Sequence, residues 1–568
     1  MNVNVEDRLG GTLIKKTEFS DRTRAQNIET FKTELLDVLV IGGGIVGAGL
    51  IRDLALNGGI KAGLIEQGDF ANGTSSATSQ LVHGGFRYLL KRDIELVKNS
   101  RREREILCRI APNLVKPIPL ALLCYKGDPY PLTGIQLAAH YYNCLSKTDE
   151  KEKSIAIRDV RKIRHLVGPI ATNTLKGCVL LWDSTVDDAR LTLATLKDAH
   201  RHGAIVANYV RFLDFVGHRE TVNTENRIYK VAAENVISGQ RFEISARKIV
   251  SATGPWSDHI WRKDPSYDGI PRLLTENAKG IHLVLPRCGK EDNADAYGLI
   301  SFTQAEKQRR RNPRVIFILP GAHNTSIVGT TETTPKEDLA SVRPSANEVT
   351  YLLSEAQRIF PEKTLNKDTI IAAYAGTRPL IAAKRHVHGF TKTGFVSREH
   401  LITDSPSGIM YLYGGKLTTH RQMAEETVNH LAAFLNVPRA CKTSIYPLPN
   451  AVGEASDADA ERLFNRYGEG YSTILKFITE DGTLAERVTP SLPFTKAELL
   501  YAYWGEMAIT LEDLLWRRTR IGWTPDQGVD IAPKIAQFLG EKNSWNATKI
   551  AAEVEAYREH IRWLNSNL

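Results

Sequence analysis

The chain has 568 residues with a formal net charge of +9, and 42% of its residues are hydrophobic and 24% charged. This size predicts two or three domains, and the composition is ordinary for a soluble globular protein. The six cysteines are scattered without a C-x-x-C pair, which argues against a zinc site or disulfide framework and fits a reducing cytosol. Residues 1–34 are predicted to form a polar arm and a short lead-in helix rather than a secretory signal, and no segment is predicted to span a membrane.

A strand, a glycine turn and a helix open the first predicted domain. Residues 36–41 are an apolar run with a single acid, which predicts a parallel strand buried on both faces. The glycines that follow have the spacing G-x-G-x-x-G and are Gly42, Gly44 and Gly47. They allow a tight turn, close approach of a pyrophosphate and close packing of the helix predicted over residues 45–57.

The strand predicted over residues 62–65 ends in Glu66, which follows Gly44 by 22 residues. A carboxylate here would accept hydrogen bonds from ribose hydroxyls, which favours FAD or NAD over NADP. The glycine motif alone is weak, but strand, turn, helix, strand and acid in this order favour dinucleotide binding over a plain turn.

The second informative segment is residues 72–88. It packs small hydroxyl residues into a loop and places His83, Arg87 and Tyr88 around a Gly-Gly pair. Such a loop can approach a ligand closely and donate hydrogen bonds, so we predict a cofactor and substrate loop rather than a polar surface loop.

Further motifs lie along the rest of the chain: W-D-S-T-V-D-D-A-R (182–190), A-T-G-P-W (252–256), K-G-I-H-L-V (279–284), I-V-G-T-T-E (327–332), A-G-T-R-P-L (375–380), Y-G-G-K-L-T-T-H-R (413–421) and D-L-L-W-R-R-T-R (513–520). With the glycine turn and the hydroxyl loop, these ordered motifs resemble the FAD-dependent glycerol-3-phosphate dehydrogenases over about residues 34–525. The chain departs from that family at Gln80, where a basic residue is usual, and at His420, where a tyrosine is usual.

The expected fold is an α/β FAD-binding Rossmann-like domain interleaved with an antiparallel-sheet substrate domain (α+β) over residues 35–440. The FAD-binding segments are expected at about 35–110, 181–258 and 376–440, and the substrate segments at about 111–180 and 259–375. Residues 441–568 are expected to form a C-terminal all-helical domain.

The implied FAD contacts gather at the glycine turn, the hydroxyl loop and three later strand ends. They are Gly42, Gly44, Gly47, Glu66, Thr74, Ser75, Ser76, Ser79, Gln80, Leu81, His83, Gly84, Gly85, Val210, Ala252, Thr253, Gly254, Trp256, Gly415, Lys416, Leu417 and Thr418. No metal ligand set is predicted.

The resemblance implies oxidation of sn-glycerol 3-phosphate to dihydroxyacetone phosphate by hydride transfer to flavin N5. The general base is expected to be His83 or His282, because histidine titrates near neutral pH. Arg378 could be a surface charge, but the resemblance favours a phosphate clamp, because a guanidinium binds phosphate oxygens through two parallel bonds. The predicted substrate-binding residues are Arg87, Tyr88, Arg378 and Lys416.

Reduced flavin needs an electron acceptor. The dehydrogenases of this family use membrane quinone, whereas the related oxidases use oxygen and usually carry an insertion that is not obvious here. We therefore expect membrane quinone as acceptor and a cytoplasmic protein in peripheral contact with the inner leaflet of the cytoplasmic membrane. Oxygen as acceptor and a homodimer stay open.

Two other function classes compete with this interpretation. A flavin oxidoreductase or oxidase of the same fold could act on a 2-hydroxy acid or an amino acid, but a carboxylate needs fewer cations than the pair Arg87 and Arg378 supplies. A nucleic-acid-binding protein would need basic residues interleaved with aromatics on one face. Only the cluster Arg309–Arg311 with Arg314 is dense enough, and it is more typical of a solvated loop, so no nucleic acid partner is expected.

Three further segments leave their roles open. Asp187 and Asp188 are predicted to open a helix, where capping is at least as well supported as catalysis. The apolar residues within 117–146 are expected in the core, although an exposed face could contact a membrane surface. The C-terminal helices are predicted around residues 494–507, 511–520 and 547–563, with Thr495 and either Asn543 or Ser544 as N-caps. They form either a structural cap or a docking surface that uses Arg517, Arg518 and Arg520.

Overall fold

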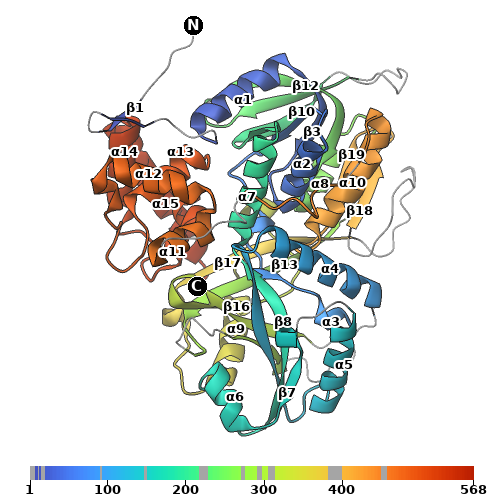
Figure 1. Ribbon diagram of the computed structural model, residues 1–568, viewed down its shortest axis with the longest axis vertical. Helices are drawn as coiled ribbons and strands as arrows, with labels where there is room; N and C mark the ends of the chain where they lie inside the picture. Colours follow the sequence, from blue (N-terminus) through green and yellow to red (C-terminus); the bar gives the residue numbers. More distant parts are fainter. Residues whose placement is uncertain are drawn as a thin grey trace.

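The structure is a computed structural model that describes residues 7–9, 12–14, 19–89, 93–145, 150–216, 228–269, 275–290, 297–304, 314–381, 400–439, 441–449 and 457–568. Figure 1 shows two sheet-containing parts stacked along the long axis, with a group of helices beside their junction. The basic cluster Arg309–Arg311 lies outside the described residues.

In the described part of the chain, the first sheet contains eight strands: β3 (Leu35–Ile41), β4 (Ala62–Ile65), β9 (Ile205–Ala207), β10 (Val210–Val216), β11 (Tyr229–Asn235), β12 (Arg241–Ser251), β18 (His400–Asp404) and β19 (Met410–Gly414). The order is β10-β11-β12-β3-β4-β9, with β19 beside β12 and β18 beside β19. The centre is parallel, as predicted, whereas β10, β11 and β18 form antiparallel pairs at its margins.

Helices cover both faces of this sheet. They are α1 (Asp21–Thr33) on one face and α2 (Ile45–Asn57), α7 (Asp188–Arg201) and α10 (His420–Leu435) on the other. Val38 and Val40 of β3 pack in the core with α2, while Leu36 and Leu39 pack in the core with α1. The strand is therefore apolar on both faces, and the predicted bounds of α2 and β4 are confirmed.

The second sheet has nine strands within the described ranges: β5 (Leu81–Val82), β6 (Val115–Tyr125), β7 (Ile155–Ile157), β8 (Leu175–Val186), β13 (Thr275–Pro286), β14 (Gly298–Phe302), β15 (Val315–Gly321), β16 (Thr325–Gly329) and β17 (Ala372–Ile381). Its order is β17-β13-β16-β15-β14-β6-β8-β5, with β7 beside β8. The pairs are antiparallel except β14 with β6. This sheet carries the helices α3 (Phe86–Leu89), α4 (Ile94–Ile110), α5 (Leu132–Cys144), α6 (Val160–Val167) and α9 (Ala346–Ile359).

Segments of the two sheets alternate along the chain, as expected for interleaved domains. The predicted limits near residues 181 and 376 fall inside β8 and β17, which continue the second sheet. The limits of the domains themselves stay a prediction. On α5, Ile135 and Tyr142 are buried in the core as expected, whereas the side chains of Leu137 and Tyr141 are exposed.

The C-terminal part is helical, as predicted: α11 (Ala458–Tyr467), α12 (Gly470–Glu480), α13 (Lys496–Gly505), the π-helix η10 (Asp513–Arg518), α14 (Ala532–Asn543) and α15 (Ala547–Asn565). Thr495 caps α13 through a reciprocal pair of bonds with Glu498, which confirms that prediction. The other cap prediction is wrong, because Asn543 and Ser544 end α14 and Asn546 caps α15. Within the described residues, no helix has both the length and the apolarity of a membrane span.

Candidate active site

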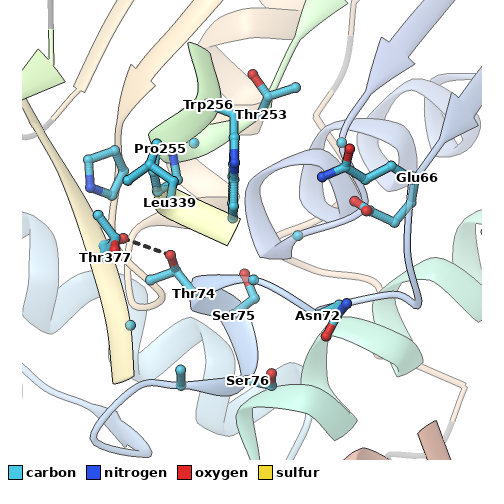
Figure 2. Close-up of a pocket in the computed structure, with 18 of the residues that line it drawn as sticks. Glu66, Asn72, Thr74, Ser75, Ser76, Thr253, Pro255, Trp256, Leu339 and Thr377 are labelled. Atoms are coloured by element: carbon cyan, nitrogen blue, oxygen red, sulfur yellow. Dashed lines mark hydrogen bonds between the residues drawn. The ribbon is translucent and has the colours of Figure 1, made fainter. Parts of the chain in front are cut away.

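A cavity of about 780 Å³ lies where the two sheets and the C-terminal helices meet. Figure 2 shows that Glu66 lies across the cavity from Thr377, with the hydroxyl loop between them. The predicted cofactor residues that line it are Gly42, Gly44, Glu66, Thr74, Ser75, Ser76, Val210, Ala252, Thr253, Gly254, Trp256, Gly415, Lys416 and Leu417. The structure therefore brings together residues that are up to 375 positions apart in the chain.

The glycine turn forms the floor at one end of the cavity. Gly42 has a φ of +114°, and a Cβ there would lie 2.6 Å from the carbonyl oxygen of Ala252. A Cβ on Gly47 would lie 1.9 Å from the carbonyl oxygen of Gly42, so only glycine lets α2 start this close to β3. Gly47 does not line the cavity and acts by letting α2 pack closely on the turn. Gly44 and the N-terminus of α2 line the cavity and suit a pyrophosphate.

Glu66 fixes the turn as well as facing the cavity. Its carboxylate accepts hydrogen bonds from the backbone N–H of Gly43 (2.7 Å) and of Gly68 (2.9 Å). Burial raises the pKa of Glu66 above its ordinary value, and these two N–H groups oppose that rise. The carboxylate keeps acceptor capacity for ribose hydroxyls, since each oxygen offers two lone pairs.

The hydroxyl loop is tied to three other segments. Ser75 Oγ accepts the backbone N–H of Ile45 at 2.9 Å, and Thr74 Oγ1 donates to the carbonyl oxygen of Thr377 at 2.7 Å, the bond dashed in Figure 2. Thr78 donates to Asp188 through both its N–H (3.0 Å) and its hydroxyl (2.7 Å). These bonds hold the loop against α2, β17 and α7.

The rest of the predicted loop contacts do not line this cavity. They are Ser79, Gln80, Leu81, His83, Gly84, Gly85 and the later Thr418. Several support the loop: the N–H of His83 donates to Thr418 Oγ1 at 3.1 Å, and the N–H of Gly84 donates to Asp183 Oδ1 at 2.7 Å. A Cβ on Gly84 would lie 2.0 Å from the Tyr142 hydroxyl, so the loop needs glycine there for close packing.

Two predicted substrate residues, Tyr88 and Lys416, lie together before the N-terminus of α10, close to the predicted base candidate His83. The ammonium of Lys416 lies 4.2 Å from the ring centre of Tyr88, and the rings of His83 and Tyr88 are 6.5 Å apart and 27° from parallel. The side chain of Arg87 is outside the described residues, so its predicted contact with substrate is not located.

His282 and Arg378 lie on the paired strands β13 and β17. His282 Nε2 is 2.8 Å from Ser79 Oγ, and its ring lies almost parallel to that of Tyr374, with centres 5.0 Å apart. Arg378 donates to Thr330 Oγ1 at 2.8 Å. Burial, assisted by the positive charge of Arg378, lowers the pKa of His282 to about 3, so the imidazole is neutral at physiological pH.

The C-terminal helices form a wall that sequence reasoning missed. Glu512, Trp516, Arg517, His560, Trp563 and Leu564 line the cavity, together with Leu339, Ala340 and Val342 from the segment before α9. Apart from Trp516 and Arg517, these positions belong to no recognisable motif, and their roles depend on how the C-terminal helices pack against the rest of the molecule. The D-L-L-W-R-R-T-R segment was the one signal that pointed to this wall.

The three arginines of that segment are not a docking surface, which corrects the sequence-based alternative. The exposed fractions of Arg517, Arg518 and Arg520 are 2%, 2% and 1%. Arg517 and Arg518 both donate to Asp69 at 2.7 Å, in the loop after β4. Arg520 pairs with Asp188 at 2.6 Å, and Asp187 is the N-cap of α7, so both acids have structural contacts.

The cavity fits FAD on its own geometry. The glycine cradle and helix N-terminus would hold the pyrophosphate, Glu66 would face the ribose, and Gly415, Lys416 and Leu417 bring the segment before α10 to the cavity. His282 and Arg378 lie on the neighbouring strands β13 and β17, next to Tyr374 and Thr377, which line the cavity. The site therefore combines a nucleotide cradle with a neutral imidazole and nearby cations.

Comparison with known proteins supports this description. The model of the family described as "FAD dependent oxidoreductase" matches residues 37–421, and that of the "C-terminal domain of alpha-glycerophosphate oxidase" matches residues 410–550. A Synechocystis protein named glycerol-3-phosphate dehydrogenase is 31% identical over 94% of this chain and 98% of its own length. A Bos taurus protein named mitochondrial glycerol-3-phosphate dehydrogenase is 30% identical over 95% of this chain and 75% of its own length.

Solved structures give the same picture. The glycerol-3-phosphate dehydrogenase from Bacillus halodurans in complex with FAD covers 97% of this chain and 99% of its own, with a TM-score of 0.75 and 26% identity. The L-alpha-glycerophosphate oxidase from Mycoplasma pneumoniae covers 73% of this chain and all of its own, with a TM-score of 0.53 and 15% identity, which shows a shared fold.

Proposed function

Since this chain belongs to the family of FAD-dependent glycerol-3-phosphate dehydrogenases, we propose that it oxidises sn-glycerol 3-phosphate to dihydroxyacetone phosphate. FAD, when bound, supplies the hydride acceptor at its N5 atom. The observation that carries the proposal is a neutral buried histidine, His282, within electrostatic reach of Arg378 on the adjacent strand, with Tyr374 between His282 and the cavity lining. The histidine can take a proton and the arginine can hold a phosphate.

His282 is the better candidate for the general base, and His83 the second. The ring of His282 is held by Ser79 and Tyr374, and a neutral imidazole has a lone pair with which to accept the hydroxyl proton. Its low pKa reflects burial beside Arg378 without a compensating anion. A phosphate dianion bound to Arg378 would supply that charge and raise the pKa of His282 toward the working pH.

Arg378 is proposed as a phosphate clamp, together with Arg87, Tyr88 and Lys416. Gly280 leaves room for the guanidinium, since a Cβ there would lie 2.5 Å from it. A hydrogen bond to a charged group contributes roughly 1.5–3 kcal/mol, so several such bonds would give a phosphate monoester a clear advantage over a carboxylate. This argues against a 2-hydroxy acid or an amino acid as substrate.

Electrons are proposed to leave through membrane quinone, with the protein in the cytoplasm and peripherally bound to the membrane. The net charge of +9 supports attraction to anionic lipid. Oxygen is the competing acceptor. The two are separated by comparing oxygen uptake with reduction of a soluble quinone analogue, and membrane contact by sedimentation with anionic and neutral vesicles.

The decisive experiment follows the visible absorbance of the bound flavin without oxygen while glycerol 3-phosphate is added. We expect prompt bleaching that a quinone analogue reverses. Lactate and an amino acid serve as matched controls and should leave the flavin oxidised. A flavin that stays yellow with glycerol 3-phosphate but bleaches with either control would overturn the assigned substrate, and bleaching reversed only by oxygen would overturn the assigned acceptor.

A further inference from the structure

Four buried side chains form a continuous stack from the C-terminal helices to His282. The rings of His282 and Tyr374 have centres 5.0 Å apart and planes 16° from parallel, and those of Tyr374 and Trp523 are 5.4 Å and 13°. The guanidinium of Arg520 lies 4.7 Å from the ring centre of Trp523. The exposed fractions of His282, Tyr374, Trp523 and Arg520 are all 4% or less.

The same arginine supports the hydrogen-bond partner of His282. Arg520 donates to Asp188 at 2.6 Å, and the carboxylate of Asp188 accepts the N–H and the hydroxyl of Thr78. The next residue, Ser79, places its Oγ 2.8 Å from His282 Nε2. One residue of the C-terminal helical part is therefore linked both to the face of the His282 ring and to the loop that holds its Nε2.

Tyr374 joins these two links. Its hydroxyl donates to the carbonyl oxygen of Thr78 at 3.0 Å while its ring lies between His282 and Trp523. Within the described residues, His282 Nδ1 has no hydrogen-bond partner, so the ring is held by a single hydrogen bond and by its stack. A single bond permits the ring to rock about it, and the parallel face of Tyr374 prevents this.

We propose that Trp523 and Arg520 are positioning residues, which set the orientation of the His282 ring for removal of the substrate hydroxyl proton. The proposal rests on the proposed function, in which His282 is the base. It gives the C-terminal helices a part in the reaction beyond forming the cavity wall. Trp523 stacks on Tyr374, and Arg520 bonds to the Asp188 carboxylate that holds Thr78, so both act on His282 through Tyr374 and Thr78.

The test uses the complete holoenzyme with Trp523→Leu and Trp523→Phe. Leucine fills part of the space without a ring, whereas phenylalanine keeps a smaller stacking face. We expect Trp523→Leu to slow anaerobic flavin reduction at saturating glycerol 3-phosphate by at least about tenfold, because a base displaced by about 1 Å loses roughly that or more. The dissociation constant of the substrate should change little in Trp523→Leu. Trp523→Phe should recover most of the rate of flavin reduction. If Trp523→Leu loses FAD, the rate and pH profile of Trp523→Phe are measured in its place.

A pH profile separates positioning from simple destabilisation. The groups that face His282 are Ser79 from the hydroxyl loop and Tyr374 and Arg378 from β17. Burial is the main cause of the low pKa of His282, so opening the stack to water should raise that pKa and move the acid limb of the reduction rate to higher pH. Trp504→Leu is the matched control, because Trp504 is equally buried among the C-terminal helices and bonds to Asn543 away from the stack.

The outcomes are distinct. A Trp523→Leu enzyme with the wild-type rate and acid limb, or one no more affected than Trp504→Leu, overturns the positioning role. A His282→Gln enzyme that still reduces its flavin at the wild-type rate overturns the base assignment, and the inference with it. Titration of the His282 imidazole in histidine-labelled holoenzyme, assigned with His282→Gln, needs no turnover. A raised pKa in Trp523→Leu supports the stack even if glycerol 3-phosphate proves not to be the substrate, and an unchanged pKa counts against it.

Discussion

The two ends of the cavity are built in different ways. At the nucleotide end, Gly42, Gly44 and Gly47 shape the site with backbone, and Glu66 fixes that backbone through two N–H groups. At the other end, the site depends on side chains such as His282, which meets Ser79 across 203 positions of the chain. The first end is encoded by a short run of residues, and the second by the docking of several elements. Substitutions at each end in turn test this difference.

The largest effect is expected from Gly47→Ala, which breaks the backbone-built end. The added methyl would lie 1.9 Å from the carbonyl oxygen of Gly42, and backbone atoms cannot move aside as a side chain can. We expect a protein without bound FAD and with a much lower unfolding temperature, measured by flavin absorbance per chain and by thermal denaturation. Gly482→Ala is the control, because its Cβ would meet open space. A fully yellow Gly47→Ala protein would contradict the close contact of α2 with β3.

The next effect concerns the ion pairs that join the C-terminal helices to the nucleotide end. Burial alone would raise the pKa of Asp69, but the charges of Arg518 and Arg517 outweigh it and hold that pKa below its ordinary value. Asp69→Asn leaves two buried guanidinium groups without their carboxylate, which should lower the free energy of unfolding by about 3–5 kcal/mol at neutral pH in urea denaturation.

The sign of the pH dependence checks the same carboxylate. Because the pKa of Asp69 is lower in the folded than in the unfolded chain, its ionised carboxylate stabilises the fold fully above the unfolded-state pKa of about 3.9. This stabilisation is lost as the pH falls through the folded-state pKa of Asp69. The difference between wild type and Asp69→Asn should therefore shrink below about pH 4. Glu34→Gln, in an exposed pair with Lys61, is the control and should cost about 0–1 kcal/mol. An equal loss in the two variants would mean that the buried pairs contribute no more than surface ones.

A smaller, more local effect is expected from Arg378→Ala at the end built from side chains. The fold and the bound flavin should remain, while the dissociation constant for glycerol 3-phosphate rises by about ten- to over a hundredfold, as the loss of roughly 1.5–3 kcal/mol predicts. Substrate titration of the oxidised flavin spectrum measures this. Lys367→Ala, an exposed cation just before β17, should leave the affinity unchanged. Unaltered affinity in Arg378→Ala would remove this residue from the clamp.

The smallest effect at neutral pH is expected from His420→Gln. Burial lowers the pKa of His420 to about 4, so the unfolded chain takes up this proton below pH 6.5 while the folded chain does not. Because the unfolded chain is favoured by binding this proton, the free energy of unfolding is highest above pH 6.5 and is lower by roughly 2 kcal/mol at pH 5. The variant should lose less stability than wild type between pH 7.5 and pH 5, and His165→Gln, at an exposed site, should behave as wild type. Equal losses in all three proteins would show that His420 does not drive this dependence.

Sequence patterns predicted local features best. The apolar run of β3, the glycine spacing and the bounds of α2 and β4 all follow from neighbouring residues, and the structure has them as predicted. The cap at Thr495 was also local, since its partner Glu498 is three positions away. The prediction of an N-cap at Asn543 or Ser544 was wrong because α14 ends there and a short turn follows. Asn546 is the N-cap of α15, and its side chain accepts a hydrogen bond from the N–H of Lys549.

The amino-acid sequence by itself determined the nucleotide cradle and, through ordered motifs, the enzyme family, because a glycine turn acts through backbone that its own residues set. Tertiary structure alone decided that Arg517, Arg518 and Arg520 are buried partners of acids far along the chain rather than a docking surface. It also decided that Trp523 reaches His282 through Tyr374. A charge or ring in a sequence does not specify its partner, because burial and pairing depend on which elements pack together.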